Sequence, residues 1–306
     1  MSRRFIFLLV ATVVMLYFSI ILFMLKPLHT VHGDAFSMRF SFRQAAVVDW
    51  CKPLRWREPP RDVVALVSYP GSGNTWLRYL LQQATGIITG SVYRDHGLQL
   101  HGFPGEEVTN GSVLVVKTHE QNFICQSAII LIRNPRDAIL AEFHRLWRGH
   151  IGTAPKSVFQ KRIRSTNSRI KNKESTSSKG ARREHPEWLY HFKTQLRSWE
   201  SLHLTWLTNF LGPIHIVFYD QLVKDTRNIL MGILDFLNNT VTEDDLYCAL
   251  MHKEGIYRRR NKLQNFDPYS PQMYEQLKVV KTKVYNLVND YKKKHNSTKK
   301  QRVTSN

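Results

Sequence analysis

The strongest constraint on the fold is a short apolar run that ends in a glycine-rich turn. Residues 63–67 read Val-Val-Ala-Leu-Val, which is typical of a buried parallel strand. The run stops at Pro70-Gly71-Ser72-Gly73, and an amphipathic helix follows. This order points backbone N–H groups and the positive end of a helix dipole at one spot, which suits a phosphate or a sulfate. An ordinary strand-to-helix turn has the same pattern, and the lysine of a nucleotide-kinase P-loop is absent.

Three further apolar runs also end in polar residues. These runs, with the residues that follow them, are 113–116 with Lys117-Thr118-His119, 128–132 with Arg133-Asn134-Pro135-Arg136-Asp137, and 214–218 with Tyr219-Asp220. Helical patterns separate the runs, so the strands should pair in parallel with helices on both faces. We therefore expect an α/β fold, a three-layer P-loop-like parallel sheet. Ligands of such sheets bind at the carboxyl ends of the strands, where these polar residues lie.

The helical patterns have recognisable starts. Asn134 and Pro135 predict a helix that runs to about Trp147, and Thr242 is suited to cap a helix over 243–252. Further helices are expected from Pro186, near 221–237 and from Pro271. Residues 87–111 have no clear period and predict a surface loop that borders the site, and the basic, serine-rich stretch 156–186 predicts a disordered insertion.

The N-terminal sequence predicts a membrane anchor. Residues 5–25 form an uncharged apolar run of 21 residues, long enough to span a bilayer as a helix. A cleaved signal peptide is the alternative, but the end of the run offers no small-residue cleavage site. Two arginines in the short preceding tail favour a cytosolic N-terminus. The expected layout is a cytosolic tail (1–4), a transmembrane anchor (5–25), a luminal stem (26–61), a globular domain (62–295) and a basic tail (296–306).

Three N-x-[ST] sequons fit a luminal domain and predict glycosylation at Asn110, Asn238 and Asn296. Three cysteines, Cys51, Cys125 and Cys248, allow one disulfide and one free thiol in an oxidising lumen, with the pairing open. Their spacing fits no zinc site.

The net charge of +20 is concentrated in two stretches. Ten basic residues and one acidic residue lie between Lys156 and Arg183, and six basic residues and one acidic residue lie between Asp290 and the end of the sequence. The charge therefore belongs to a solvated insertion and a tail rather than to a nucleic-acid-binding face. A basic luminal surface would still attract acidic glycans or an anionic membrane.

Four polar residues follow three of the predicted strands, so the fold can gather them around the glycine turn: Lys117, His119, Arg133 and Tyr219. Lys117 and His119 are two residues apart, and side chains two apart on a strand point the same way. A base and a cation would then face one pocket, as transfer from an anionic donor to a hydroxyl requires. A histidine after a strand is otherwise more often structural.

These segments together resemble the sulfotransferase superfamily. Residues 68–76 resemble its 5′-phosphosulfate loop, 117–119 its K-T-H catalytic segment, 133–137 its 3′-phosphate motif, and 218–220 a tyrosine-acid pair at the end of a later strand. The order and spacing of the four motifs agree over residues 62–260. Residues 141–143, 152–155 and 253–260 are similar to the WSCD family of type II membrane sulfotransferase-like proteins. The cysteine-rich WSC domains of that family are not recognised, so we expect anchor, stem and sulfotransferase domain.

The resemblance implies transfer of a sulfuryl group from 3′-phosphoadenosine 5′-phosphosulfate (PAPS) to a hydroxyl of a glycan, such as sialic acid or another terminal sugar, at the Golgi membrane. It implies His119 as the base and Lys117 as the cation that offsets charge on the bridging oxygen. The residues implied to hold PAPS are Gly71, Ser72, Gly73, Asn74, Thr75 and Trp76 around the phosphosulfate, Arg133, Arg258, Arg259 and Arg260 at the 3′-phosphate, and Tyr219 near the adenine. It implies no metal, and leaves a homo-oligomer open.

Two positions depart from the pattern of the superfamily. Gly71 stands where many members carry a lysine or arginine, and Ala141 stands where a serine for the 3′-phosphate is usual. Lys117 or Arg78 would have to replace the first contact, and His144 or Arg145 the second. The WSCD family shares both departures.

The departures leave a second hypothesis, a catalytically weak or inactive protein that binds PAPS or acidic glycans. A membrane-anchored P-loop kinase is a third, disfavoured because the Walker lysine and an acidic magnesium-ligand pattern are missing.

Overall fold

The computed structural model describes residues 48–162, 182–257 and 266–303, with side chains except at residues 161–162, 182–183 and 295–303. The expected anchor (5–25) and the arginines of 258–260 lie outside these ranges. Within them, no helix combines the length and the hydropathy of a membrane span.

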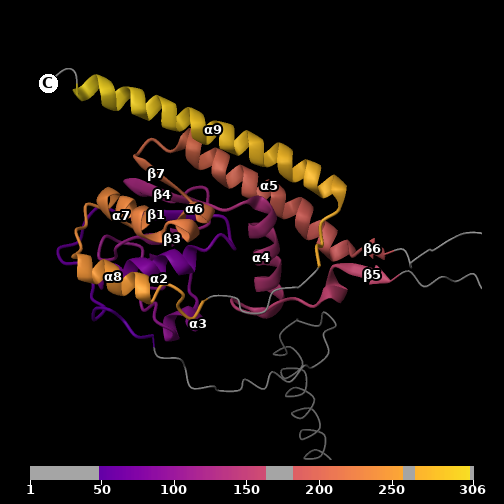
Figure 1. Ribbon diagram of the computed structural model, residues 1–306, viewed down its shortest axis with the longest axis horizontal. Coiled ribbons are helices and arrows are strands. Elements are labelled where there is room, and N and C mark those ends of the chain that lie inside the picture. Colours follow the sequence, from indigo (N-terminus) through magenta and orange to yellow (C-terminus); the bar gives the residue numbers. More distant parts are fainter. Residues whose placement is uncertain (1–47, 163–181, 258–265, 304–306) are drawn as a thin grey trace, which may run out of the picture. The chain divides into compact units, whose positions relative to one another are not determined.

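A five-stranded parallel sheet forms the centre of the described structure (Figure 1). Its strands, in spatial order, are β2 (Gly90–Ser91), β3 (Val116–Thr118), β1 (Val64–Ser68), β4 (Ser127–Ile132) and β7 (Ile214–Phe218). β1 lies in the middle, paired with β3 on one side and β4 on the other. Because all pairings are parallel, the strands present their carboxyl ends at one edge, as predicted.

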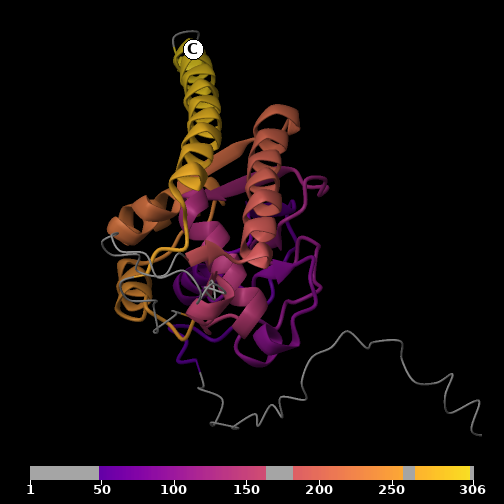
Figure 2. The ribbon, with the colours of Figure 1, turned by 90° about the vertical axis from the view of Figure 1, so that its right-hand side faces the viewer.

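Two hydrophobic cores cover the two faces of the sheet, because alternate residues of a strand point to opposite faces. Ala65 and Val67 of β1 belong to one core, which also contains residues of α4 (Pro135–Arg148), α5 (Pro186–Asn209) and α9 (Pro271–Val303). Leu66 belongs to the other, with α2 (Asn74–Thr85), α7 (Thr226–Phe236) and α8 (Glu243–Met251). Figures 1 and 2 both show α9 lying along α5. The expectation of helices on both faces is met.

Local signals set several helix starts as expected. The Asn134 side chain accepts a hydrogen bond from the Arg136 amide, with Pro135 as the first helical residue of α4. Thr242 and Asp245 form a capping box at α8. The helix expected near 221–237 is instead two, α6 (Tyr219–Lys224) and α7, because the side chain of Asp225 caps the second one.

Other expectations need correction. The strand expected over 113–116 is shifted to β3, so that Lys117 lies within the strand. Residues 87–111 contain β2 and a short helix, α3 (His96–Leu100). The stretch expected to be disordered, 156–186, begins with η1 (Lys156–Val158), and β5 (Gln160–Arg162) pairs antiparallel with β6 (Arg182–Glu184). Residues 163–181 of this stretch lie outside the described residues. Backbone pairing forms this hairpin despite the polar composition.

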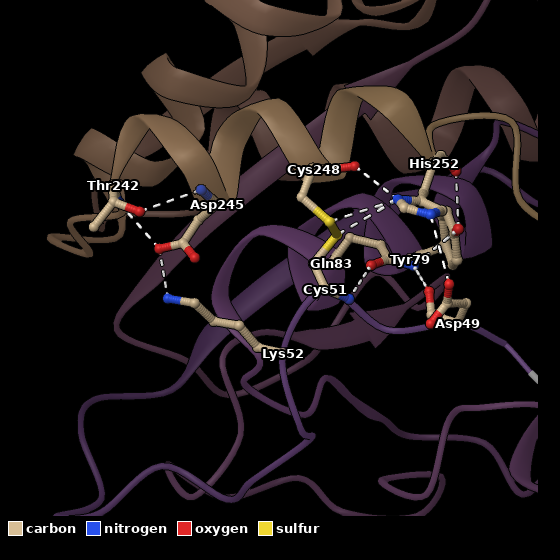
Figure 3. Close-up of a disulfide and its surroundings, with 9 residues drawn as sticks. All are labelled: Asp49, Cys51, Lys52, Tyr79, Gln83, Thr242, Asp245, Cys248 and His252. Atoms are coloured by element: carbon tan, nitrogen blue, oxygen red, sulfur yellow. Dashed lines mark hydrogen bonds and ion pairs between the residues drawn. A yellow bond between two sulfur atoms is a disulfide. The ribbon is translucent and has the colours of Figure 1, made fainter.

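Residues 48–63, which precede β1, are attached to the domain. Cys51 and Cys248 form a disulfide that connects this segment to α8 (Figure 3). Lys52 pairs with Asp245 at 2.5 Å, and His252 Nδ1 lies 3.7 Å from Cys51 Sγ and 3.6 Å from Cys248 Sγ. The third cysteine, Cys125, is a half-buried free thiol, and burial raises its pKa to about 11.

The sequons lie in different settings. Asn110 is exposed in a turn, and its side-chain oxygen accepts hydrogen bonds from the amide and hydroxyl of Ser112. Asn238 is exposed directly after α7 with a positive φ of 47°. Asn296 falls inside α9, which continues to Val303 through most of the stretch expected as a tail.

Candidate active site

The glycine turn after β1 leaves the start of α2 open to an anion. Gly71 and Gly73 have φ angles of 77° and 93°, a region that favours glycine. Gly73 is the N-cap of α2, so no side chain caps the helix, and its first turn carries no acidic residue. The first backbone N–H groups of a helix have no partner within it and lie at the positive end of its dipole. The turn therefore fits the predicted phosphosulfate loop in its backbone.

The side chains of the loop divide into two roles. Ser72 is fully buried, and its hydroxyl has no hydrogen-bond partner among the residues that the structure describes. Thr75 and Trp76 are half-buried in the first turn of α2. The Asn74 amide, by contrast, donates to Leu66 O at 3.1 Å and to Ser68 Oγ at 3.0 Å. Asn74 therefore fastens the helix start to β1, and its side-chain N–H groups are not directed at a ligand.

The position of Gly71 accounts for the missing basic side chain. A Cβ atom placed there would lie 2.5 Å from Ala138 O and 2.9 Å from Glu142 N, both in the backbone of α4. It would also lie 3.2 Å from Ala141 Cβ. The two departures from the superfamily pattern therefore pack against each other. A lysine or arginine at position 71 has no room unless α4 moves.

His119 is anchored to the strand that leads into this loop. Its Nδ1 lies 2.6 Å from Ser68 O, so Nδ1 carries the proton and donates it to the carbonyl. Nε2 then holds the lone pair, and no partner for it is found within the described ranges. Burial and the nearby charge of Lys117 lower the pKa of His119 to about 3. The imidazole is therefore neutral near pH 7, as a base must be.

Lys117 is a buried cation, 7% exposed, with no ion pair to any described residue. Burial, and then repulsion from Arg78, lower its pKa to about 8, although Glu106 and Asp95 act to raise it. Its ammonium lies 5.5 Å from the ring centroid of Tyr93, and the same ring stacks on His119 at 5.4 Å. Lys117 and His119 therefore reach the same aromatic ring, on one side of the sheet edge.

Arg133 and Tyr219 meet on the other side of the loop. Arg133 Nη1 donates to Gly71 O at 2.8 Å, and the guanidinium carbon lies 4.5 Å from the ring centroid of Tyr219. The Tyr219 ring is so close to Gly73 that a Cβ there would lie 2.6 Å from Cε2. Trp76 contacts this ring edge-on at 5.8 Å. The ends of β3, β4 and β7 thus each bring one predicted residue to the loop.

Three basic residues that the sequence offers as substitutes for the missing contacts are engaged elsewhere. Arg78 is completely buried and pairs with Glu106 at 2.7 Å, so it is not free to replace a basic residue in the loop. His144 is buried, and its Nδ1 accepts from the Ala154 amide at 3.1 Å. Arg145 binds both carboxylate oxygens of Glu142 at 2.6 and 2.7 Å. The predicted group 258–260 lies outside the described residues.

The sequence did not single out Tyr93, which contacts both Lys117 and His119. It lies two residues after β2, in a stretch without periodicity. The only signal for Tyr93 was that it is an aromatic residue in a loop next to a strand end. Nothing in the spacing relates it to Lys117 and His119, which are 24 and 26 positions later.

Comparisons with known proteins identify the family of this chain. The model of the sulfotransferase domain family matches residues 61–302. A WSCD family member of Aedes aegypti is 43% identical over 267 residues, covering 78% of each chain. A WSCD family member of Drosophila melanogaster is 45% identical over 230 residues, covering 74% of this chain and 66% of the relative. A crystal structure of a mouse sulfotransferase complexed with PAP aligns with a TM-score of 0.41 and 16% identity, covering 74% of this chain and 85% of that one. The chain carries a sulfotransferase domain and belongs to the WSCD family.

Proposed function

We propose that this protein transfers a sulfuryl group from PAPS to a hydroxyl of a carbohydrate on glycoconjugates of the secretory pathway. The observation that carries the proposal is the hydrogen bond between His119 Nδ1 and Ser68 O. Ser68 is the last residue of β1, directly before the glycine turn. The bond presents the basic Nε2 of the imidazole at the edge where the anion-binding turn begins.

The residues at this edge suit the charges of the reaction. His119 Nε2 accepts the proton of the acceptor hydroxyl while the hydroxyl oxygen bonds to sulfur. Lys117 offsets the negative charge on the bridging oxygen as its bond to sulfur breaks and 3′-phosphoadenosine 5′-phosphate leaves. The amides at the start of α2 and the unpartnered Ser72 hydroxyl are suited to hold the phosphosulfate. Such chemistry depends mostly on positioning and electrostatics.

We assign Arg133 to the 3′-phosphate and Tyr219 to the adenine, and Arg258, Arg259 and Arg260 to the 3′-phosphate as well. Arg133 already donates to the Gly71 carbonyl and stacks on Tyr219, so the donor would lie along an existing contact between β4 and β7. We further propose a type II Golgi membrane protein that is anchored by residues 5–25 and has its domain in the lumen. A luminal sulfotransferase meets glycoconjugates there. The resemblance to the WSCD family is the basis for a terminal sugar such as sialic acid as the acceptor.

One observation favours the weaker alternative, a protein that binds PAPS or acidic glycans without turnover. The lack of room at Gly71 removes a cation that other sulfotransferases use near the transferred group. Loss of one such contact costs about 2–4 kcal/mol of transition-state stabilisation.

Sulfate transfer by the full chain in detergent separates these functions. We expect radiolabelled sulfate to pass from PAPS to at least one member of a panel of sialylated and desialylated glycans. His119→Ala should lower the rate by about 10²–10⁴-fold, while adenosine 3′,5′-bisphosphate still raises the melting temperature. His96→Ala, an exposed histidine on α3, is the matched control. No product with the wild-type chain, or equal product with His119→Ala, would contradict the proposal.

A further inference from the structure

Both backbone polar groups of Tyr93 are hydrogen-bonded. Its N–H donates to Ser91 Oγ at 3.0 Å, and its carbonyl accepts from the Glu107 amide at 3.0 Å. Val92, directly before it, donates to the carbonyl of Lys117 at 3.0 Å. The phenol therefore projects from a segment that is hydrogen-bonded to β3 and to the far end of the same loop.

The side chain of Tyr93 contacts Thr118, His119 and Lys117, and its hydroxyl shares a hydrogen bond with the side chain of Thr118. Its hydroxyl accepts a hydrogen bond from the His119 backbone N–H at 3.1 Å. Its ring stacks on the imidazole with centroids 5.4 Å apart and planes at 26°. The ammonium of Lys117 lies 5.5 Å from the ring centroid, within the range of a cation–π interaction. One side chain thus contacts the base and the cation together.

We propose that Tyr93 is the positioning residue of the sulfuryl transfer, which fixes the imidazole of His119 and the ammonium of Lys117 relative to each other. This inference rests on the proposed function of the same site. Tyr93 acts through these two residues, since its hydroxyl faces the backbone of His119 and its ring contacts both of their side chains. Transfer requires both groups at the reacting atoms at once, and an error of about 1 Å in their placement costs about 10²-fold in rate.

The charges around Lys117 explain why an aromatic ring matters there. The positive groups that face it are Arg78 from α2, Arg145 from α4 and His119 when protonated, and the negative groups are Glu106 and Asp95 from the loop after β2. Glu106 is already paired with Arg78, and Asp95 with His150. The ring face is therefore the contact that directly stabilises the protonated ammonium in a site whose burial disfavours it.

Two variants of the full chain test the roles of the ring and the hydroxyl. Tyr93→Leu removes both, and we expect kcat to fall by about 10²-fold with a smaller change in the KM for PAPS. Tyr93→Phe keeps the ring, and we expect it to stay within about fivefold of the wild-type rate. Tyr247→Leu, an exposed tyrosine on α8, is the matched control for the loss of a tyrosine.

The protonation of Lys117 provides a measurement that is independent of the acceptor. The pH dependence of its acetylation by acetic anhydride, followed by peptide mass spectrometry, reports its pKa in the intact chain. We expect a midpoint near pH 8 for the wild type and for Tyr93→Phe. For Tyr93→Leu we expect a midpoint about one pH unit lower, because the ring no longer stabilises the charged form.

The outcomes separate the inference from the proposed function. Absence of sulfate transfer by the wild-type chain contradicts the proposed function, and the acetylation midpoints still decide whether Tyr93 controls Lys117. An active wild type together with a Tyr93→Leu variant of equal kcat and unchanged midpoint overturns the inference and leaves the proposed function standing. If Tyr93→Leu unfolds, the Tyr93→Phe variant decides: a 10²-fold loss despite the retained ring would overturn the role given to the ring.

Discussion

Two buried cations, Arg78 and Lys117, lie close enough for their charges to repel, and the fold treats them in opposite ways. The guanidinium of Arg78 has hydrogen-bond acceptors for its N–H groups and an aromatic ring against its face. It pairs with Glu106 at 2.7 Å, donates to the hydroxyl and carbonyl of Thr89 at 2.9 and 3.0 Å, and stacks 4.5 Å from the ring centroid of Phe103. Lys117 has only the face of Tyr93 and no carboxylate in contact among the described residues.

The difference fits the roles that we propose, a structural one for Arg78 and a chemical one for Lys117. A buried charge is costly unless it is paired and hydrogen-bonded. Arg78 meets that condition and joins α2 to the loop that carries Glu106. Lys117 does not meet it, and burial lowers its pKa to about 8. A cation left short of partners at the open end of a strand is available to an anionic donor, and the pairing of Arg78 keeps that residue from competing for the donor.

The largest expected effect follows from removing the paired cation. Arg78→Met leaves the fully buried carboxylate of Glu106 without its partner, which typically costs about 3–5 kcal/mol. We expect the thermal unfolding midpoint to drop by about 10 °C.

The matched variant Arg78→Met/Glu106→Leu removes both charges, and we expect it to recover most of this loss. Calorimetry with the disulfide intact makes the measurement. Equal melting temperatures for Arg78→Met and the wild type would mean that the pair does not stabilise the domain.

The unpaired cation should respond in the opposite way. Lys117→Met is expected to lower sulfate transfer by about 10²–10³-fold, because the charge that offsets the leaving group is lost. At pH 7 the same variant should be more stable than the wild type by about 1–3 kcal/mol, since a buried charge with a depressed pKa is replaced by an apolar side chain.

The sign of this stability difference depends on pH. With a folded pKa of about 8, below the value of an unfolded lysine, the folded state binds fewer protons than the unfolded state between these two values. Wild-type stability therefore rises relative to the variant as the pH passes through this window. Urea denaturation at pH 7 and pH 9.5 checks it, and a variant that is less stable at pH 7 would refute the role assigned to Lys117.

The residues that gather at the carboxyl ends of the strands can be predicted from the sequence, because their positions depend on short-range signals. Apolar runs locate the strands, and parallel pairing then forces the residues that follow them to one edge. Arg133 and Tyr219 meet the glycine turn for this reason, as does His119. β3 begins at Val116, three residues later than predicted, although Leu114 donates to Ile88 O and Val115 O accepts from the Gly90 amide just before the strand.

The partners of Arg78 and Lys117 could not be predicted in the same way. Glu106 is 28 residues from Arg78, in a loop without periodicity, so nothing in the spacing assigns the pair and Arg78 looked free. Tyr93 is hidden for the same reason. The packing of Gly71 against the backbone of α4 likewise depends on tertiary approach, and from the sequence the missing side chain looked like a lost function.

The smallest expected effect is the pH dependence of the wild-type reaction. His119, with its pKa lowered to about 3 by burial and by Lys117, stays neutral throughout the working range, so no acidic limb is expected above pH 5. Lys117 must be protonated, so kcat/KM should be flat up to about pH 7 and fall through a midpoint near pH 8, by about tenfold between pH 7 and pH 9.

Bound donor is anionic and favours the protonated ammonium, so the limb in kcat should lie at higher pH than the limb in kcat/KM. In Lys117→Arg the basic limb should disappear, because a guanidinium stays charged over this range. A basic limb at pH 8 that persists in Lys117→Arg would assign the titration to another group and remove the chemical distinction between the two cations.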